Sequence, residues 1–112
     1  MGHDFYLKYD ISREIYKRLD DTLERELSNL IFSDKSDLLM QTQNSQPSIM
    51  ATSVAIYNAL VYEKLLTRGS FHFVAGHSLG EYSALVINES LIFEDSVRLL
   101  QIRSKAMQES MP

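Results

Sequence analysis

The residues best suited to chemistry lie in one short segment, Gly76-His77-Ser78-Leu79-Gly80. A serine with a glycine two positions away on each side has the spacing of a nucleophile elbow, the sharp turn between a strand and a helix that exposes a serine hydroxyl. The glycines avoid clashes across the turn, and the helix N-terminus directs free N–H groups at an oxygen that becomes anionic. We therefore predict that Ser78 is a catalytic nucleophile and that the backbone N–H of Leu79 donates to the oxyanion. The alternative is a tight strand–helix turn in which the serine only caps the helix.

A nucleophilic serine needs a base, and the sequence offers no obvious one. His77 adjoins Ser78, but consecutive side chains at such a turn point in different directions, and His3 lies near the terminus. We expect His72 to lie in a strand, either packed or at its edge. Because no histidine follows Ser78, the hydrolase order of serine, acid and histidine cannot be completed within these 112 residues. We therefore expect the sequence to be part of a larger domain.

Arg103 is the second residue whose placement is unusual for its type. It follows Leu99 by four positions and precedes Met107 by four, which puts a guanidinium on or beside the apolar stripe of a helix. A guanidinium that faces a core binds carboxylate or phosphate groups through its planar fork. The alternative is an arginine whose stem packs against apolar side chains while its charged end reaches water. The pattern leaves both open.

The elements that would position these residues are mostly helical. Apolar residues three or four apart predict long helices, one capped by Ser12 and one opened by Pro47, and a short run of aromatic and branched residues predicts one strand before the elbow. The expected helices cover residues 13–32, 47–66, 81–87 and 94–111, and the expected strand covers residues 71–75. A buried strand needs neighbours on both sides, which this sequence does not supply. We therefore predict a helix-rich fragment of an α/β fold, with no domain boundary within residues 1–112.

Composition excludes several functional classes. Hydrophobic residues make up 45% and charged residues 23%, which is typical of a folded globular chain. A net charge of -4 argues against nucleic acid as a partner. The absence of cysteine excludes disulfides and thiolate zinc sites, and no other metal-ligand spacing occurs. No segment has the pattern of a membrane span or a signal peptide. We therefore expect a cytoplasmic chain that binds no metal, membrane or nucleic acid.

Residues 73–85, Phe-Val-Ala-Gly-His-Ser-Leu-Gly-Glu-Tyr-Ser-Ala-Leu, resemble the active-site segment of malonyl-CoA:acyl carrier protein transacylases. Other segments look like the same family, so the resemblance covers nearly the whole chain. These segments are residues 43–47, 51–57, 93–100 and 103–108. The resemblance implies a partial α/β-hydrolase-like transacylase core and a role in fatty-acid biosynthesis.

The resemblance also implies how the site residues would act. Ser78 would attack the thioester of malonyl-CoA and hold malonate as an oxyester, which the phosphopantetheine thiol of acyl carrier protein would then take. Arg103 matches the arginine that binds the malonyl carboxylate in this family, and Leu79 matches the residue whose backbone N–H forms half of the oxyanion hole. The implied partners are malonyl-CoA and acyl carrier protein, both as substrates, with no cofactor.

The family pattern includes parts that these residues do not contain. Its first strand and its Gly-Gln-Gly-Ser-Gln loop would precede Met1, and its catalytic histidine and small subdomain would follow Pro112. We therefore expect an internal portion of a transacylase that is inactive when isolated. Two alternatives remain open, a non-catalytic remnant of such an enzyme and a related serine acyltransferase or hydrolase that shares the elbow.

Overall fold

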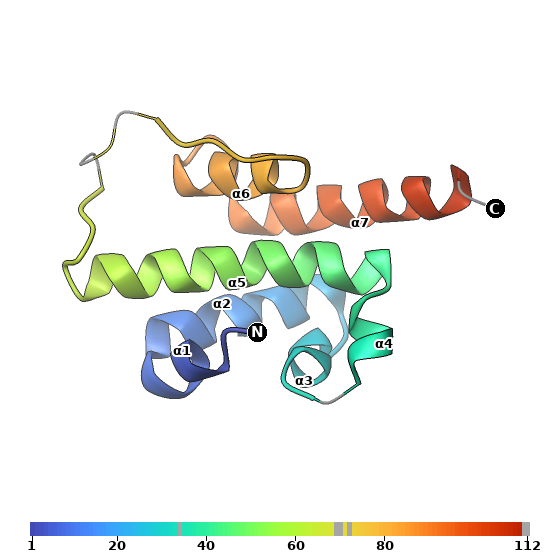
Figure 1. Cartoon of the computed structure of the whole chain (residues 1–112), viewed down its shortest axis with the longest axis horizontal. Coiled ribbons are helices and arrows are strands. Elements are labelled where there is room, and N and C mark those ends of the chain that lie inside the picture. The colour runs from blue at the N-terminus through green and yellow to red at the C-terminus, as the bar shows by residue number, and fades with distance from the viewer. Residues whose placement is uncertain (34, 69–70, 72, 111–112) are drawn as a thin grey trace.

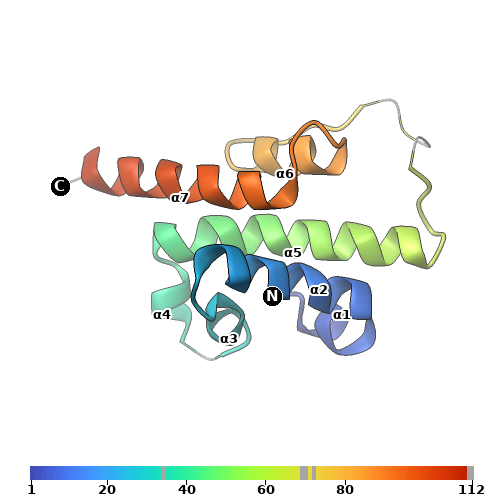
Figure 2. The same cartoon turned by 180° about the vertical axis from the view of Figure 1, so that it is seen from behind.

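The computed structural model describes residues 1–33, 35–68, 71 and 73–110. Within these residues it contains seven helices: α1 (His3–Lys8), α2 (Asp10–Leu23), α3 (Leu27–Ile31), α4 (Ser36–Leu39), α5 (Thr42–Tyr62), α6 (Gly80–Ile87) and α7 (Phe93–Ser110). Figure 1 shows that α5 runs through the middle of the molecule, with α1–α4 on one side and α6 and α7 on the other. The reverse view in Figure 2 shows the same three-layer order.

The strand predicted at residues 71–75 is wrong for the part of that segment which the structure describes. Phe71 and residues 73–75 have no regular secondary structure, and Phe73 is 91% exposed. The physical reason is the missing partner, because a lone extended segment leaves its N–H and C=O groups without a ladder. His72, which we expected to be a packed or edge residue of this strand, lies outside the described residues. The described part of the chain is therefore helical, and an extended connection leads into α6 (Figure 1).

The helix predicted over residues 13–32 is divided into α2 and α3. Glu24 adopts a left-handed conformation, with φ of 56°, and its N–H donates to the carbonyls of Asp20 and Asp21, which ends α2. Ser12 is not the N-cap that we predicted. It lies within α2, is fully buried, and its Oγ donates a hydrogen bond of 2.9 Å to the carbonyl of Ala55 on α5. The Ser12 hydroxyl therefore makes a tertiary hydrogen bond to α5 instead of the N-terminal helix cap that the local sequence pattern predicted.

The helix predicted to begin at Pro47 begins at Thr42 instead, and it ends at Tyr62 rather than near Leu66. A proline inside a helix has no N–H to donate to the carbonyl four residues earlier, here that of Gln43. Arg25 supplies a substitute, because its Nη2 lies 3.3 Å from the Gln43 carbonyl oxygen. The α5 helix can therefore extend through Pro47 toward its N-terminus.

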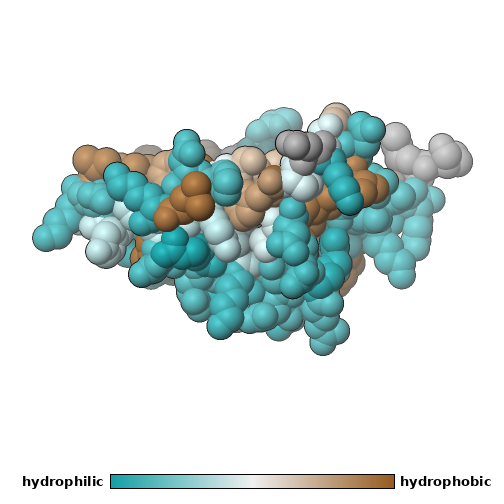
Figure 3. Space-filling model, turned by 90° about the horizontal axis from the view of Figure 1, so that it is seen from below, coloured by the Kyte–Doolittle hydropathy of each residue, from teal (hydrophilic) through white to brown (hydrophobic). Residues whose placement is uncertain are grey.

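The core lies where α2, α5 and α7 meet. Its buried apolar cluster consists of Ile15, Tyr16, Leu19 and Leu23 on α2, Leu27 and Ile31 on α3, Met50, Ala51, Val54 and Ala55 on α5, and Phe93, Val97 and Leu100 on α7. The face of the α1–α4 layer that points away from this core is largely hydrophilic, as the view from below shows (Figure 3). None of the described helices is long and apolar enough to cross a membrane.

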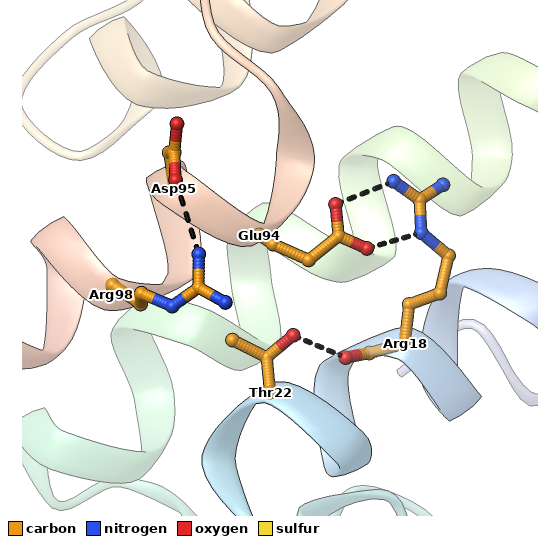
Figure 4. Close-up of polar contacts among 5 residues, drawn as sticks. All are labelled: Arg18, Thr22, Glu94, Asp95 and Arg98. Atoms are coloured by element: carbon orange, nitrogen blue, oxygen red, sulfur yellow. Dashed lines mark hydrogen bonds and ion pairs between the residues drawn. The ribbon is translucent and has the colours of Figure 1, made fainter.

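A bidentate ion pair ties α2 to α7 beside this core. Arg18 donates from Nε to Glu94 Oε2 at 2.6 Å and from Nη2 to Glu94 Oε1 at 2.8 Å (Figure 4). The guanidinium carbon also lies 5.1 Å from the centre of the Phe93 ring. The hydrogen bonds from Arg18 lower the pKa of Glu94, and the same contact raises the pKa of Arg18. Both groups therefore stay charged at neutral pH.

Candidate active site

Ser78 lies at the exposed turn between the extended connection and α6. Its φ is 58°, in the left-handed region that costs free energy for any residue with a Cβ. The turn is closed by two backbone hydrogen bonds, from Gly80 N–H to the His77 carbonyl at 3.0 Å and from Glu81 N–H to the Ser78 carbonyl at 3.1 Å. The sharp turn that the motif predicts is therefore present, although no strand is formed before it in the described residues.

The two glycines of the motif play different parts in this turn. A Cβ added to Gly76 would lie 2.0 Å from the carbonyl oxygen of Gly80 and 2.8 Å from the backbone nitrogen of Glu81, so the turn can close only without a side chain there. A Cβ on Gly80 would meet no described atom within 4 Å. Our expectation that both glycines avoid a clash is therefore wrong for Gly80.

Arg103 on α7 reaches the Ser78 hydroxyl across the gap between α7 and the turn. Its Nη2 donates to Ser78 Oγ at 2.9 Å, and its Nη1 donates to Oε1 of Gln46 at 2.6 Å. The guanidinium carbon lies 5.7 Å from the centre of the Tyr82 ring. The structure thus brings together two predicted site residues that are 25 positions apart in sequence. It shows an arginine that is held by specific contacts rather than one that only reaches water.

No carboxylate contacts Arg103 within the described part of the chain. Four other arginines each form an ion pair there: Arg13 with Asp10, Arg18 with Glu94, Arg68 with Glu89 and Arg98 with Asp95. The partners of Arg103 are a hydroxyl, an amide oxygen and an aromatic ring, none of which carries a charge. Its positive charge is therefore not neutralised by a neighbour and is available to an anion.

Gln46 is a site residue to which the sequence pattern gave no role. It is 5% exposed, and besides Arg103 it contacts Met107, whose sulfur lies 3.4 Å from its Nε2. A buried amide in a mostly apolar helix is the feature that could have identified it, because buried polar groups need specific partners. Those partners lie on α7, more than 50 positions away, so the sequence could not name them.

Leu79 occupies the N-cap position of α6. Within the described residues its backbone N–H donates no hydrogen bond, while the N–H groups of the next three residues donate to carbonyls at the turn. The positive end of the α6 dipole lies at the same place. The geometry therefore leaves this N–H free to donate to an oxyanion that forms at the Ser78 hydroxyl.

The described histidines do not supply a base to Ser78. His77 is exposed, and the hydrogen bond described for the Ser78 hydroxyl is with Arg103 rather than with His77. His3 lies against Phe32 and Tyr6, with ring centres 5.0 Å and 6.3 Å apart. Likewise, no group of three or more potential metal ligands occurs among the residues that the structure describes. The Ser78 hydroxyl, the free N–H of Leu79 and the Arg103 guanidinium thus lie together here, and none of the described histidines contacts the hydroxyl.

Beside the turn there is an open hollow of about 390 Å³ between α5 and α6. Residues 74–77 form one wall, and Ile49 and Ser53 on α5 form another. Leu79 also lines it, so the hollow reaches the place where the free N–H lies. The hollow therefore adjoins the turn on the side of residues 74–77, while neither Ser78 nor Arg103 lines it.

Comparison with known proteins identifies the family. The acyl transferase domain family matches residues 1–112. The malonyl CoA-acyl carrier protein transacylase of Bacillus subtilis (strain 168) is 40% identical over 113 residues, which cover 100% of this chain and 34% of that protein. The chain thus spans about a third of the length of this relative.

Solved structures give the same result. The acyl-carrier-protein S-malonyltransferase from Bartonella henselae has a TM-score of 0.94 and 38% identity, covering 100% of this chain and 36% of that chain. A malonyl-transacylase solved in complex with a type II PKS acyl-carrier protein has a TM-score of 0.88 and 32% identity, covering 100% of this chain and 35% of that one. These neighbours have the α/β acyltransferase fold, whereas the described residues of this chain form helices and no strand. The chain belongs to the acyl transferase domain family.

Proposed function

We propose that the protein transfers a malonyl group from malonyl-CoA to the phosphopantetheine thiol of acyl carrier protein, as a step of fatty-acid biosynthesis in the cytoplasm. The observation that carries the proposal is the 2.9 Å contact between the Ser78 hydroxyl and the Arg103 guanidinium. A malonyl group has an electrophilic carbonyl and a carboxylate separated by one methylene. A nucleophile and an uncompensated cation in direct contact match that pair of groups.

In the first half of the reaction, Ser78 Oγ attacks the thioester carbonyl carbon of malonyl-CoA, and the bond to sulfur breaks as coenzyme A leaves. The N–H of Leu79 and the N-terminus of α6 stabilise the oxyanion that forms in between. In the second half, the carrier thiol attacks the malonyl-serine ester and the Ser78 hydroxyl is regained. We propose that the base which takes the Ser78 proton lies in a part of the protein outside these 112 residues, because the relatives are much longer.

Arg103 would provide selectivity in this scheme. It would release Ser78 Oγ and pair with the malonyl carboxylate, a group that an acetyl substrate lacks. A site built to pair with a charged group discriminates against a substrate without it, because the site's own polar groups are then left unpaired. The names of the relatives, which combine malonyl with acyl carrier protein, support this choice of substrates.

The test is covalent labelling of the protein in the form that its source cells make. We expect incubation with malonyl-CoA to add one malonyl group, and peptide mapping to place it on Ser78. Ser78→Ala should abolish the label, whereas Ser90→Ala, at an exposed serine after α6, should keep it. A label that persists at another residue in Ser78→Ala would refute the assignment of the nucleophile.

The same experiment separates the alternatives. Transfer of the label to acyl carrier protein supports the transacylase, and release of free malonate in its absence supports a hydrolase that shares the elbow. The intact mass of the protein from its source cells should be recorded with the label. A mass of 12.9 kDa together with no labelling would favour a non-catalytic remnant.

A further inference from the structure

The side-chain amide of Gln46 binds the Arg103 guanidinium, and both its oxygen and its nitrogen have a hydrogen-bond partner. Its Oε1 accepts from Arg103 Nη1 at 2.6 Å, and its Nε2 donates to Met107 Sδ at 3.4 Å. A guanidinium can only donate hydrogen bonds and a thioether can only accept them, so the oxygen must face the arginine. Since Gln46 is almost fully buried, water cannot readily replace either partner of its amide.

Arg103 divides its donors between the protein interior and the site. Nη1 is held by buried Gln46, whereas Nη2 points to the exposed hydroxyl of Ser78. An arginine side chain has several rotatable bonds, and a fixed acceptor on one nitrogen restricts where the other can lie. Gln46 therefore determines which donor of Arg103 faces the nucleophile.

The absence of charge on Gln46 matters as much as its hydrogen bond. Arg18 shows the other case, because Glu94 occupies two of its nitrogens and compensates its charge. An amide oxygen accepts a hydrogen bond without this compensation. We propose that Gln46 is a positioning residue that gives the site its preference for carboxylate-bearing acyl groups, by orienting Arg103 while leaving its charge available. This inference rests on the proposed function.

Two substitutions separate orientation from charge. Gln46→Glu keeps the shape and the acceptor but adds a negative charge 2.6 Å from Nη1, so it should compete with a malonyl carboxylate. We expect malonylation of Ser78 by malonyl-CoA to fall about 10- to 100-fold, with acetylation by acetyl-CoA much less affected. Gln46→Met removes the acceptor with little change in volume, and we expect a smaller fall in the ratio of malonyl to acetyl labelling. Gln43→Glu is the matched control, because it adds the same charge at an exposed position one turn earlier and should leave that ratio unchanged.

Rates of Ser78 acylation by both thioesters should be measured in the protein as its cells make it, with thermal unfolding of each variant alongside. A loss of folding would reduce both labels together and would leave the ratio between them unchanged. A Gln46→Glu variant that folds and keeps the wild-type ratio would overturn the inference while the proposed function stands. If wild-type protein is not labelled at Ser78 by either thioester, the proposed function fails instead. Gln46→Met distinguishes the two parts of the argument, because a ratio as low as that of Gln46→Glu would assign the effect to lost orientation and refute the role of charge.

Discussion

Arg18 and Arg103 both donate from two guanidinium nitrogens to side chains of neighbouring elements, but the partners differ in charge. Arg18 contacts both oxygens of one carboxylate and links α2 to α7 (Figure 4). Arg103 contacts an amide and a hydroxyl, and no carboxylate among the residues described. In the pair of Arg18 and Glu94, each charge is compensated by the opposite charge of its partner. Arg103 retains an uncompensated charge next to an exposed hydroxyl, which is what an anionic substrate requires.

The surroundings of the two arginines differ in the same way. Arg18 lies beside the packed core, with the Phe93 ring under its guanidinium. Arg103 lies beside an exposed turn that contains a non-glycine residue with positive φ. Strained backbone and incompletely satisfied polar groups cluster at functional sites, whereas matched pairs stabilise the structure. The comparison therefore gives Arg18 a structural role and supports the substrate role that we propose for Arg103.

The largest effect should come from moving Ser78 away from Arg103. Gly76→Ala would place a methyl group 2.0 Å from the Gly80 carbonyl oxygen and force the turn to open. We expect the rate of Ser78 acylation by malonyl-CoA to fall about 100-fold, since a displacement of about 1 Å can cost that much. Gly80→Ala meets no described atom within 4 Å and should change the rate only slightly. Equal losses in the two variants would contradict the role that the structure gives to Gly76.

Removal of the uncompensated charge should have the next largest effect. Arg103→Ala is expected to lower malonylation of Ser78 about 10- to 100-fold, the scale of a lost hydrogen bond to a charged group, and to spare acetylation. Arg98→Ala, which removes an exposed arginine paired with Asp95 on the same helix, serves as the control. Parallel acylation assays with malonyl-CoA and acetyl-CoA measure the effect. Losses of similar size for both substrates would exclude a carboxylate-binding role.

Breaking the matched pair should cost stability and leave selectivity intact. Glu94→Gln is expected to lower the free energy of unfolding by up to about 1 kcal/mol at neutral pH, because the pair is partly exposed. Since the folded-state pKa of Glu94 lies below its unfolded value, the contribution is present above the ordinary glutamate pKa and is lost as pH falls through the folded value. The free energies of unfolding of wild type and Glu94→Gln, measured by urea unfolding, should therefore become equal in acid.

The control for this pair is Asp95→Asn, which breaks the more exposed contact with Arg98. It should change the free energy of unfolding by less than Glu94→Gln does. If Glu94→Gln altered the ratio of malonyl to acetyl labelling, the division between a structural and a substrate arginine would be wrong.

Features that depend on residues close together in sequence were predicted correctly more often than features that depend on distant residues. The apolar spacing of three or four residues predicted helices where α2, α5 and α7 lie, because a helix repeats its own side chains at fixed spacing. Helix ends were predicted less well. Arg25 satisfies the carbonyl that Pro47 leaves without a donor, and Ser12 donates to α5 rather than capping α2. Both outcomes depend on residues many positions away.

The prediction of a strand before Ser78 was wrong for a related reason. Its residue types favour extended backbone, and the described residues of the segment lead into α6 without helix, but a strand exists only when another strand pairs with it. No property of residues 71–75 themselves could decide that pairing. The same limit applied to Gln46, whose importance depends on two residues of α7.

The sharp turn at Ser78 and the free N–H of Leu79 could be predicted from sequence, because they depend on contacts within residues 76–82. The contacts of Arg103 with Ser78 and Gln46, and of Arg18 with Glu94, could be learned only from the folded structure. Which charges are compensated depends on how helices distant in sequence pack against one another. A guanidinium has the same chemistry wherever it occurs, and its neighbours determine whether it stabilises the structure or binds a substrate.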